Sequence, residues 1–405
     1  MRDRLHFFFL NVGHFLDHLL MLVFATVAAL VLTREWGVSY AALVPYATPG
    51  FVAFGVCALP AGWLADRWSR QGMMAVFFVG IGLASMATAL ATTPFEMALG
   101  LFVIGVFAAI YHPVGLALLV QKFARTGAAI GINGVFGNLG VGSAALITGY
   151  FIDHGGWRAG FLVPGAFSLL IGLAYTAVFW SDIWVANANR EEATRPARQE
   201  GGSAAPSRDF IVRLLAIVFF TTAISGIIFQ STTFALPKVF EERLTGIAGS
   251  ATLVGWLAFI VFAVASLAQV VVGFLLDRFG PRPVFMAAAA IQAVFFAAMP
   301  GLTDWAALVV ALAFMLGAFG QIPINDYMIG RLAKSELRAS IYGARYVVTF
   351  AVLGATLPLI SWVHDGWGFD MLFKILAVAA AVIFAAVALL PARLPEQGGA
   401  AAARA

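Results

Sequence analysis

The sequence predicts an all-α integral membrane protein in which twelve transmembrane helices form two pseudo-symmetric six-helix bundles. Composition is the first indication, because 62% of the 405 residues are hydrophobic and only 11% are charged. A soluble chain of ordinary composition carries about 25% charged residues. The second indication is a cationic motif that occurs once in each half of the chain, which is typical of membrane proteins built by internal duplication.

Twelve apolar stretches are of about the length that crosses a bilayer. A hydrocarbon core of about 30 Å requires about 20 helical residues. The first stretch is too long for a signal-peptide core, so we expect it to stay as a helix. The stretches occupy residues 5–32, 39–65, 72–92, 95–120, 126–152, 158–181, 210–237, 249–276, 283–300, 305–330, 339–363 and 369–391.

A polar segment separates the sixth stretch from the seventh. It contains Glu191-Glu192, Arg195-Pro196 and Gly201-Gly202, a composition typical of flexible linkers. We therefore expect an N-terminal bundle over residues 1–182, a cytoplasmic linker over 183–209, a C-terminal bundle over 210–391 and a disordered cytoplasmic tail over 392–405.

The duplicated motif has the same core in both copies. Gly62-Trp63-Leu64-Ala65-Asp66-Arg67, followed by Arg70, returns 211 residues later as Gly273-Phe274-Leu275-Leu276-Asp277-Arg278, followed by Arg282. Other positions repeat at nearly the same offset: Pro113 with Pro323, Gly134 with Gly343, and Trp157 with Trp367. An offset that stays almost constant favours duplication over chance.

Basic residues predict the orientation. With the N-terminus in the cytoplasm, 18 Lys and Arg residues fall in inner segments and 5 in outer segments. Positive charge concentrates on the cytoplasmic side of membrane proteins. We therefore expect a multi-pass protein of the cytoplasmic (inner) membrane with both termini in the cytoplasm.

Polar residues in the first apolar stretch are the best candidates for transport chemistry. At 100° per residue, four polar side chains of this stretch share one face of the predicted helix, and that face is about 120° wide. Asp17 lies about 18 Å along the helix from Leu5, near the bilayer midplane. An ionisable residue at that depth is costly and usually faces the bundle interior or a water-filled cavity. The candidates on this face are Asn11, His14, Asp17 and His18.

His112, in the fourth stretch, lies ten residues before Lys122 and therefore at a similar depth. Imidazole and carboxylate groups can exchange protons near neutral pH. The alternative is that an Asp–His pair here only cross-links helices by hydrogen bonding. Three histidines and a carboxylate could also bind metal, but no cysteine accompanies them, and we expect no metal and no cofactor.

The second half offers amides rather than titratable groups. Gln321 occupies the repeat position of Tyr111 and could orient a substrate. Arg345 could attract an anion or could simply pair with Asp326. The further candidates for the substrate cavity are Tyr111, Gln230, Gln321, Asn325 and Arg345. Glycines in the fifth stretch are expected to form a close helix-packing seam, at Gly134, Gly137 and Gly140.

These motifs resemble those of the major facilitator superfamily. The loop after the second stretch is similar to that superfamily's G-x-L-x-D-R-x-G-R-x motif, with Ser69 in place of the second glycine. Gly13-His14-Phe15-Leu16-Asp17, Tyr111-His112-Pro113 and Gly137-Asn138-Leu139-Gly140 resemble the fosmidomycin-resistance-like efflux branch. The resemblance implies alternating access, with helices 1, 4, 7 and 10 lining the cavity, so that His112 faces the helix 1 cluster.

The loop motif is expected to control the cytoplasmic mouth. A carboxylate at Asp66 or Asp277 can face the N-terminal end of a helix in the other half when that mouth is closed. The alternative is that the arginines only anchor the topology. The predicted gating residues are Gly62, Asp66, Arg67, Arg70, Gly273, Asp277, Arg278 and Arg282.

The sequence therefore predicts a secondary transporter rather than an enzyme. No phosphate-binding loop or nucleophile motif is present, which makes ATP-driven transport unexpected. Cys57 is the only cysteine, so no intramolecular disulfide can form. We expect a monomer whose partners are the lipid bilayer, protons and a small organic substrate, with no nucleic acid. Export by proton antiport is predicted first, uptake by symport second, and a non-transporting membrane sensor or assembly partner third.

Overall fold

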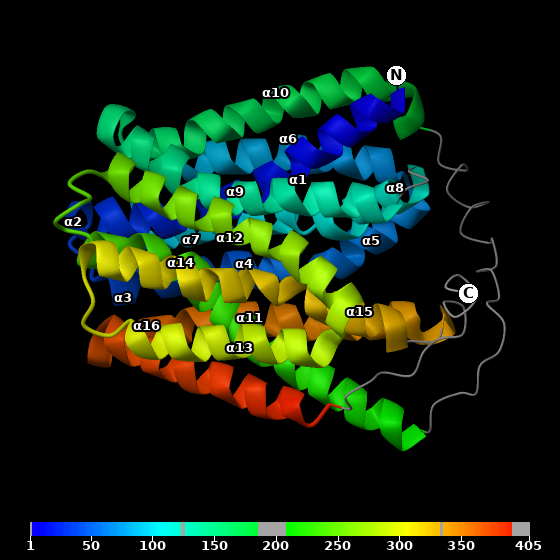
Figure 1. The fold of residues 1–405 in the computed structure, drawn as a ribbon. Helices are drawn as coiled ribbons and strands as arrows, with labels where there is room; N and C mark the ends of the chain where they lie inside the picture. The colour runs from blue at the N-terminus through cyan, green and yellow to red at the C-terminus, as the bar shows by residue number, and fades with distance from the viewer. Residues whose placement is uncertain (1, 123–125, 185–207, 333–334, 391–405) are drawn as a thin grey trace.

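The computed structural model describes residues 2–122, 126–184, 208–332 and 335–390, and all the regular secondary structure in these residues is helical (Figure 1). Side chains are not described at 122, 126–128, 208–212, 326, 329–347 and 350. Most of the expected linker and all of the expected tail lie outside the described residues. The predicted division into four segments therefore stays a prediction.

The first half contains the elements up to α10. The first membrane helix comprises α1, a π-helical stretch and α2, and the second is broken into α3, α4 and α5. The bounds are α1 Arg2–Val27, η1 Ala28–Leu32, α2 Thr33–Glu35, α3 Tyr40–Leu43, η2 Val44–Ala47, α4 Thr48–Val56, α5 Ala58–Arg67, α6 Arg70–Thr88, α7 Pro94–Ala108, α8 Tyr111–Lys122, α9 Thr126–Gly155 and α10 Trp157–Ile183.

The second half contains α11 to α16. Its bounds are α11 Arg208–Arg243, α12 Ala251–Phe279, α13 Pro281–Ala298, α14 Asp304–Gly320, α15 Ile322–Leu332 and α16 Ser335–Ala388. The last of these is two helices joined at Gly368, whose φ of 70° and ψ of −173° interrupt the helical backbone. Glycine adopts this left-handed φ without a steric penalty.

Eleven described helical stretches are long and apolar enough to cross a membrane. Twelve were predicted, and the difference arises because the last two predicted spans lie in α16 on either side of Gly368. The protein is therefore a multi-pass membrane protein with the predicted all-α architecture. Both described ends of the chain lie at the same end of the bundle (Figure 1).

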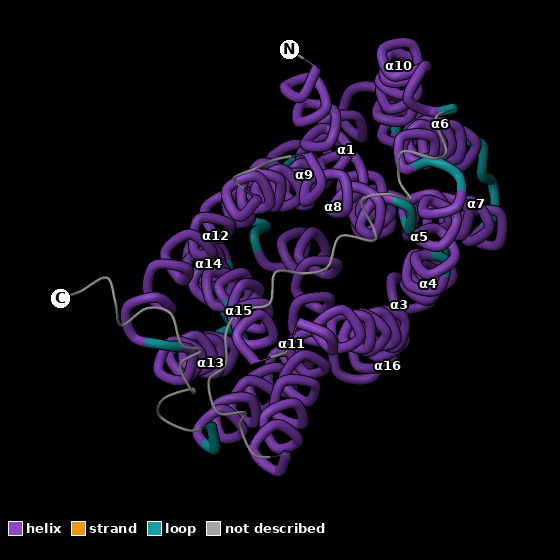
Figure 2. The backbone as a smooth tube through the Cα atoms, turned by 90° about the vertical axis from the view of Figure 1, so that its right-hand side faces the viewer, coloured by secondary structure: helices purple, strands orange, loops and turns teal. Residues whose placement is uncertain are grey.

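We call this end, which carries Arg2, Arg67 and Arg278, the inner end, because the basic residues predict that it is cytoplasmic. The opposite end, which carries Asp153 and Asp304, is the outer end. Viewed from the inner end, α1–α10 and α11–α16 form two groups (Figure 2). The groups meet where α9 packs against α12 and where α4 packs against α16.

Glycines allow the closest approach between α9 and α12. A Cβ added to Gly149 would lie 2.3 Å from the carbonyl oxygen of Ala251, and one added to Gly255 would lie 2.5 Å from that of Ala145. Separations this short leave no room for a side chain. Small residues at such crossings let helix backbones pack directly against one another in a membrane.

Polar contacts between the halves cluster at the outer end. Asp153 of α9 accepts hydrogen bonds from the backbone amides of Ala251, at 3.3 Å, and Thr252, at 2.7 Å, at the start of α12. Ser361 of α16 donates to the carbonyl of Ala41 in α3 at 2.6 Å. A Cβ added to Gly134 or Gly273, nearer the inner end, would meet nothing within 4 Å. The described conformation is therefore closed at the outer end.

The two copies of the loop motif turn by different means. Ser69 has an extended backbone, and its hydroxyl accepts a hydrogen bond from the amide of Gly72 at 3.0 Å, which caps α6. Gly280 in the second copy has a φ of 77° before α13. Ser69 therefore replaces the motif glycine without strain, because the first turn needs a cap rather than a left-handed residue.

Candidate functional site

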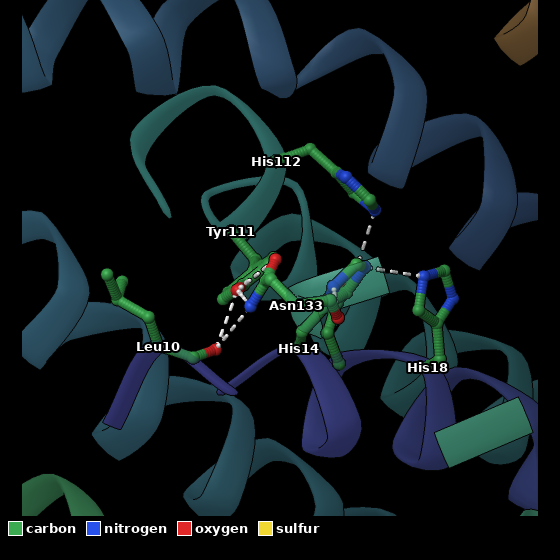
Figure 3. Close-up of polar contacts among 7 residues, drawn as sticks. Leu10, His14, His18, Tyr111, His112 and Asn133 are labelled. Atoms are coloured by element: carbon green, nitrogen blue, oxygen red, sulfur yellow. Dashed lines mark hydrogen bonds and ion pairs between the residues drawn. The ribbon is translucent and has the colours of Figure 1, made fainter. Parts of the chain in front are cut away.

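The predicted polar face of helix 1 meets His112 inside the first bundle. The Nε2 atom of His112, on α8, lies 3.5 Å from Oδ2 of Asp17, on α1. His18 and His14 lie with their Nε2 atoms 3.2 Å apart. The ring of His112 lies 5.3 Å from that of His14 and 5.4 Å from that of His18, centroid to centroid. Figure 3 shows the three imidazoles turned toward one another.

Asp17 is the most deeply enclosed member of this group. Its side chain has 0% exposure, and no described hydrogen-bond donor reaches either carboxylate oxygen. The side chain of His112 keeps 22% exposure. A carboxylate without donors in an apolar interior is costly unless it is paired or neutralised by a proton. The geometry therefore makes Asp17 a candidate proton carrier, with His112 as its partner nearer to water.

Asn133, which the sequence patterns do not single out, positions the cluster. Its backbone carbonyl accepts a hydrogen bond from Nδ1 of His14 at 2.8 Å. Its side-chain amide donates to Asn11 Oδ1 at 3.1 Å, to the Tyr111 hydroxyl at 2.9 Å and to the Leu10 carbonyl at 3.2 Å. An amide buried in an apolar helix is a signal that could have identified it. Asn133 thus joins α9 to α1 and α8 (Figure 3).

The bond to the Asn133 carbonyl determines how the histidines share protons. A carbonyl can only accept, so Nδ1 of His14 carries the hydrogen, and in the neutral ring Nε2 is the acceptor. The Nε2 atom of His18 then donates to it. The hydrogen bonds therefore run in one direction, from His18 to His14 and from His14 to the backbone carbonyl of Asn133 in α9.

Tyr111 is enclosed in the described conformation, and its predicted cavity role stays a prediction. Its side chain is fully buried, its hydroxyl donates to the Leu10 carbonyl at 2.7 Å, and its ring stacks on His14 at 4.9 Å. Asn11 is also buried and contacts Asn133, and its predicted cavity role stays a prediction. Tyr111 stacks on His14, and Asn11 accepts a hydrogen bond from Asn133, which itself binds His14. Both side chains therefore help to hold the histidine cluster in place.

The glycines of α9 divide into two groups. A Cβ on Gly137 would lie 2.6 Å from Nε2 of His14, and one on Gly140 would lie 2.2 Å from the Phe15 carbonyl. These two glycines let α9 pack against α1. Gly134 faces open space within 4 Å, so the predicted packing role is wrong for this residue in the described conformation.

The predicted second-half residues lie apart from the histidines, on the other bundle. Gln230 lies on α11, Gln321 at the end of α14 and Asn325 on α15, and all three side chains are buried. The amide nitrogens of Gln230 and Gln321 and the amide oxygen of Asn325 have no described hydrogen-bond partner. The side chains of Arg345 and Asp326 lie outside those that the structure describes, so neither proposed role of Arg345 is addressed.

The first loop motif makes its contacts within its own half. Asp66 pairs with Arg70 at 3.0 Å, and its side chain is 65% exposed. Arg70 also donates to Gln121 at 3.2 Å, and the guanidinium of Arg67 lies 4.0 Å from the ring centre of Trp63. A Cβ added to Gly62 would lie 3.3 Å from the side chain of Pro113. An exposed Asp66 fits a conformation in which the inner mouth is not closed.

The second loop motif is also exposed. Asp277 and Arg278 lie at the surface, and the guanidinium of Arg278 is 5.1 Å from the ring centre of Phe279. Arg282 is half-buried in the first turn of α13, and Gly273 faces open space. No described contact joins Asp277 to α9. The gating role of both motifs therefore stays a prediction.

A separate cavity of about 740 Å³ lies at the outer end, between the two halves. Its lining mixes apolar residues with Arg34, Glu35, Asp153 and Glu241. Arg34 faces Glu241 across the halves at 3.5 Å, which adds to the outer closure. This cavity is distinct from the histidine cluster, which lies within the first bundle.

Three nitrogen atoms of the cluster are close enough to share a cation. The ring nitrogens of His14, His18 and His112 lie within 4.8 Å of one another. No metal is expected here from the sequence, because the H-x-x-D-H spacing of helix 1 is a weak ligand pattern. The third imidazole comes from α8, and the fold places it beside the other two.

Known proteins resemble this chain along nearly its whole length. It is 26% identical over 402 residues to the gallate transporter of Pseudomonas putida, covering 89% of this chain and 85% of that protein. It is 25% identical over 395 residues to the 4-hydroxybenzoate transporter PcaK of Pseudomonas aeruginosa, covering 88% and 86%. A crystal structure of the peptide transporter POT in complex with sulfate aligns with a TM-score of 0.75 at 14% identity, covering 95% and 93%.

The solved structure supports the fold alone, while the two relatives support a transport function for small organic solutes. The similarity to the fosmidomycin-resistance-like branch stays a prediction. The family model of the Major Facilitator Superfamily matches residues 10–248 and 218–405. The chain is therefore a non-enzymatic membrane transport protein that belongs to the Major Facilitator Superfamily.

Proposed function

We propose that this protein is a proton-coupled secondary transporter of small aromatic carboxylates that works by alternating access, with Asp17 as the proton carrier. The observation that carries the proposal is the environment of Asp17. Its carboxylate is fully buried, lacks described hydrogen-bond donors and lies 3.5 Å from an imidazole that is partly exposed. An ionisable residue at membrane depth typically marks an ion pathway or proton relay.

The relatives supply the substrate class. Gallate and 4-hydroxybenzoate, which name the two relatives, both carry a carboxylate on a hydroxylated aromatic ring. Such a molecule needs hydrogen-bond donors for its anionic group and apolar surface for its ring. The buried amides of Gln230 and Gln321, which lack described partners, can donate to a carboxylate. Phe229, which precedes Gln230 in α11 and is half-buried, can offer aromatic surface to the ring.

Charge explains why a proton accompanies such a substrate. Moving one negative charge inward against a membrane potential of about 100 mV costs about 2.3 kcal/mol. Co-transport of one proton cancels that charge, so the pH gradient can then drive accumulation. Protonation of Asp17 also removes a buried charge from the interior of the first bundle, which favours the movement of that bundle around the substrate.

Export by antiport is the second candidate function. The motifs of helices 1, 4 and 5 that resemble the fosmidomycin-resistance-like branch favour it. The same Asp17 site serves both directions, because antiport requires the proton and the substrate to occupy the site alternately rather than together. We place symport first because the two long relatives are named for carboxylates, whose charge an accompanying proton neutralises.

The cellular setting is also part of the proposal. The excess of Lys and Arg in the segments predicted to be inner, 18 against 5, supports a cytoplasmic location for both termini in the inner membrane. The site lies within a single chain, which supports a monomer as the working unit. Closing of the inner mouth by Asp66 and Asp277 would then alternate with the outer closure that Asp153 forms.

A flux assay in proteoliposomes tests the function directly. Purified protein is reconstituted, and radiolabelled 4-hydroxybenzoate is followed with the outside more acidic than the inside. We expect accumulation that a protonophore collapses. The uncharged analogue 4-hydroxybenzyl alcohol serves as the matched control and is not accumulated. Expulsion of preloaded substrate with the outside more acidic than the inside would favour antiport, and no gradient-dependent flux of either kind would refute the proposal.

A further inference from the structure

We propose that His14, His18 and His112 form a binding site for a divalent transition-metal cation such as Zn²⁺, and that bound cation inhibits transport. The binding stands on the geometry of the imidazoles alone, whereas the inhibition rests on the function proposed above. The site lies wholly within the first bundle, where α1 supplies two ligands and α8 supplies the third.

The spacing of the nitrogen atoms is close to that of a metal site. Tetrahedral Zn²⁺ with Zn–N bonds of about 2.0–2.1 Å holds its ligand nitrogens about 3.3 Å apart. The Nε2 atoms of His14 and His18 are already 3.2 Å apart. The largest separation among the three ligand atoms is within 4.8 Å, so His112 needs to move by roughly 1–2 Å. Rotation of its side chain can supply that movement.

The hydrogen bond from Nδ1 of His14 to the Asn133 carbonyl, 2.8 Å long, prepares the ring for metal. Metal-binding histidines usually donate their other ring hydrogen to a carbonyl or carboxylate, which fixes the ring and the tautomer. Here that bond leaves the Nε2 lone pair of His14 pointing at the other two rings. His18 must then exchange its hydrogen from Nε2 to Nδ1 when the cation replaces the bond between the two imidazoles.

Asp17 supplies the charge that a buried cation requires. Its carboxylate lies 3.5 Å from His112 Nε2, is fully buried and has no described hydrogen-bond donor. A dication among three neutral imidazoles without an anion nearby would be strongly unfavourable in an apolar interior. His112 keeps 22% side-chain exposure, which gives the cation a route to the site.

The ligand chemistry selects the class of cation. Imidazole suits zinc, copper, nickel and iron, while magnesium and calcium prefer oxygen ligands. Three histidines leave a fourth position open, as in three-histidine zinc sites. A cation bound here would join α1 to α8 and would engage the His112 ring that lies beside Asp17. Transport would therefore stop while the metal is bound.

Metal binding is measured on the purified full-length protein in detergent. Isothermal titration with Zn²⁺ is expected to give one site per chain, and Co²⁺ is expected to give the visible absorption of tetrahedral nitrogen coordination. His14→Gln and His112→Gln are each expected to weaken binding about 10-fold or more. His154→Gln is the matched control, because His154 stacks on Tyr150 at the outer end of α9 and contacts none of the three ligands.

Each outcome decides the proposal. Loss of the site in both cluster variants, with folding verified by gel filtration and with binding intact in His154→Gln, supports it. Absence of a stoichiometric site, or equal binding in the cluster variants, overturns it whether or not the protein transports. Inhibition is then tested by adding Zn²⁺ to the flux assay: if wild-type protein binds Zn²⁺ but transports unchanged, the inhibitory role is wrong.

Discussion

His112 Nε2 lies 3.5 Å from Asp17 Oδ2, and this contact joins α8 to the centre of α1. Both groups can change protonation, but they differ in access to water. Asp17 is fully enclosed, and the His112 side chain keeps 22% exposure. A proton that reaches Asp17 from an aqueous cavity can therefore pass through His112.

We predict that His112 and His14 act as one unit rather than independently. Both rings belong to the cluster around Asp17, with centroids 5.3 Å apart. Residues within one hydrogen-bonded network show coupling of about 0.5–3 kcal/mol in double-mutant cycles. The combined His14→Ala, His112→Ala variant should therefore lose little more transport than the worse single variant. Effects that add in free energy would contradict a shared site.

His112 should also affect the pH dependence of transport. Imidazole titrates between about pH 5 and 8, and an amide does not. His112→Gln is expected to shift the pH optimum while the apparent substrate affinity is retained. The measurement is a transport rate profile across that pH range at saturating substrate. Loss of affinity at every pH would assign His112 to substrate binding instead.

Two glycines of α9 provide a matched pair of variants. A methyl group on Gly137 would meet the His14 ring at 2.6 Å, whereas one on Gly134 meets nothing within 4 Å. Because a side chain can move aside, Gly137→Ala should keep thermal stability near that of the wild type but displace His14 and reduce transport. Gly134→Ala should behave like the wild type in both assays. Equal transport by the two variants would show that the position of His14 is unimportant.

Asp153 is expected to hold the outer end closed. It accepts two backbone hydrogen bonds at the start of α12, and its carboxylate contacts the Thr252 hydroxyl. Loss of a helix cap costs about 1 kcal/mol, which corresponds to about a fivefold change in a conformational equilibrium. Asp153→Ala should therefore increase labelling of a cysteine placed at the buried Ala145, in a Cys57→Ser background. Asp365→Ala, an exposed aspartate at the same end, is the control. Unchanged labelling would show that Asp153 does not hold the outer end closed.

Asp66 should act at the opposite end. Its side chain is 65% exposed and its described ion pair is with Arg70, so we expect its predicted contact with α16 in the other conformation. Asp66→Asn is expected to remove that contact and to favour the inward-open state without abolishing substrate binding. A cysteine at Gly134 reports the inner mouth by its labelling rate, with Asp3→Asn as the control. Unchanged labelling together with unchanged transport would show that the motif only anchors the membrane topology.

The sequence is sufficient for the fold and for half of the candidate site. Helical periodicity places His14, Asp17 and His18 on one face, and counting residues places His112 at the same depth. Those inferences succeed because a membrane helix has a fixed rise and a fixed angular step. The repeat offset similarly predicts two halves and the basic residues predict the orientation, since both are properties of the chain rather than of its packing.

Tertiary contacts account for what sequence reasoning misses. The sequence patterns do not single out Asn133, which lies in a glycine-rich helix. Its role depends on hydrogen bonds to α1, and these form only because α9 and α1 pack close together. The repeat match between Tyr111 and Gln321 suggests a cavity residue, whereas neighbouring helices cover Tyr111. The hydrogen bonds that Asp153 accepts join the two halves of the protein. No local sequence pattern determines how those halves lie relative to each other. Such contacts can be identified only from the three-dimensional structure, because they form where helices cross.

The role of Asp17 as carrier of the coupling proton is tested most directly by Asp17→Asn. The variant keeps the shape of the side chain but cannot release a proton. In proteoliposomes we measure accumulation of radiolabelled 4-hydroxybenzoate driven by a pH gradient, together with exchange of labelled for unlabelled substrate at equal pH. We predict that accumulation is abolished while exchange continues. Accumulation by Asp17→Asn at the wild-type level would contradict this role and place the coupling site elsewhere.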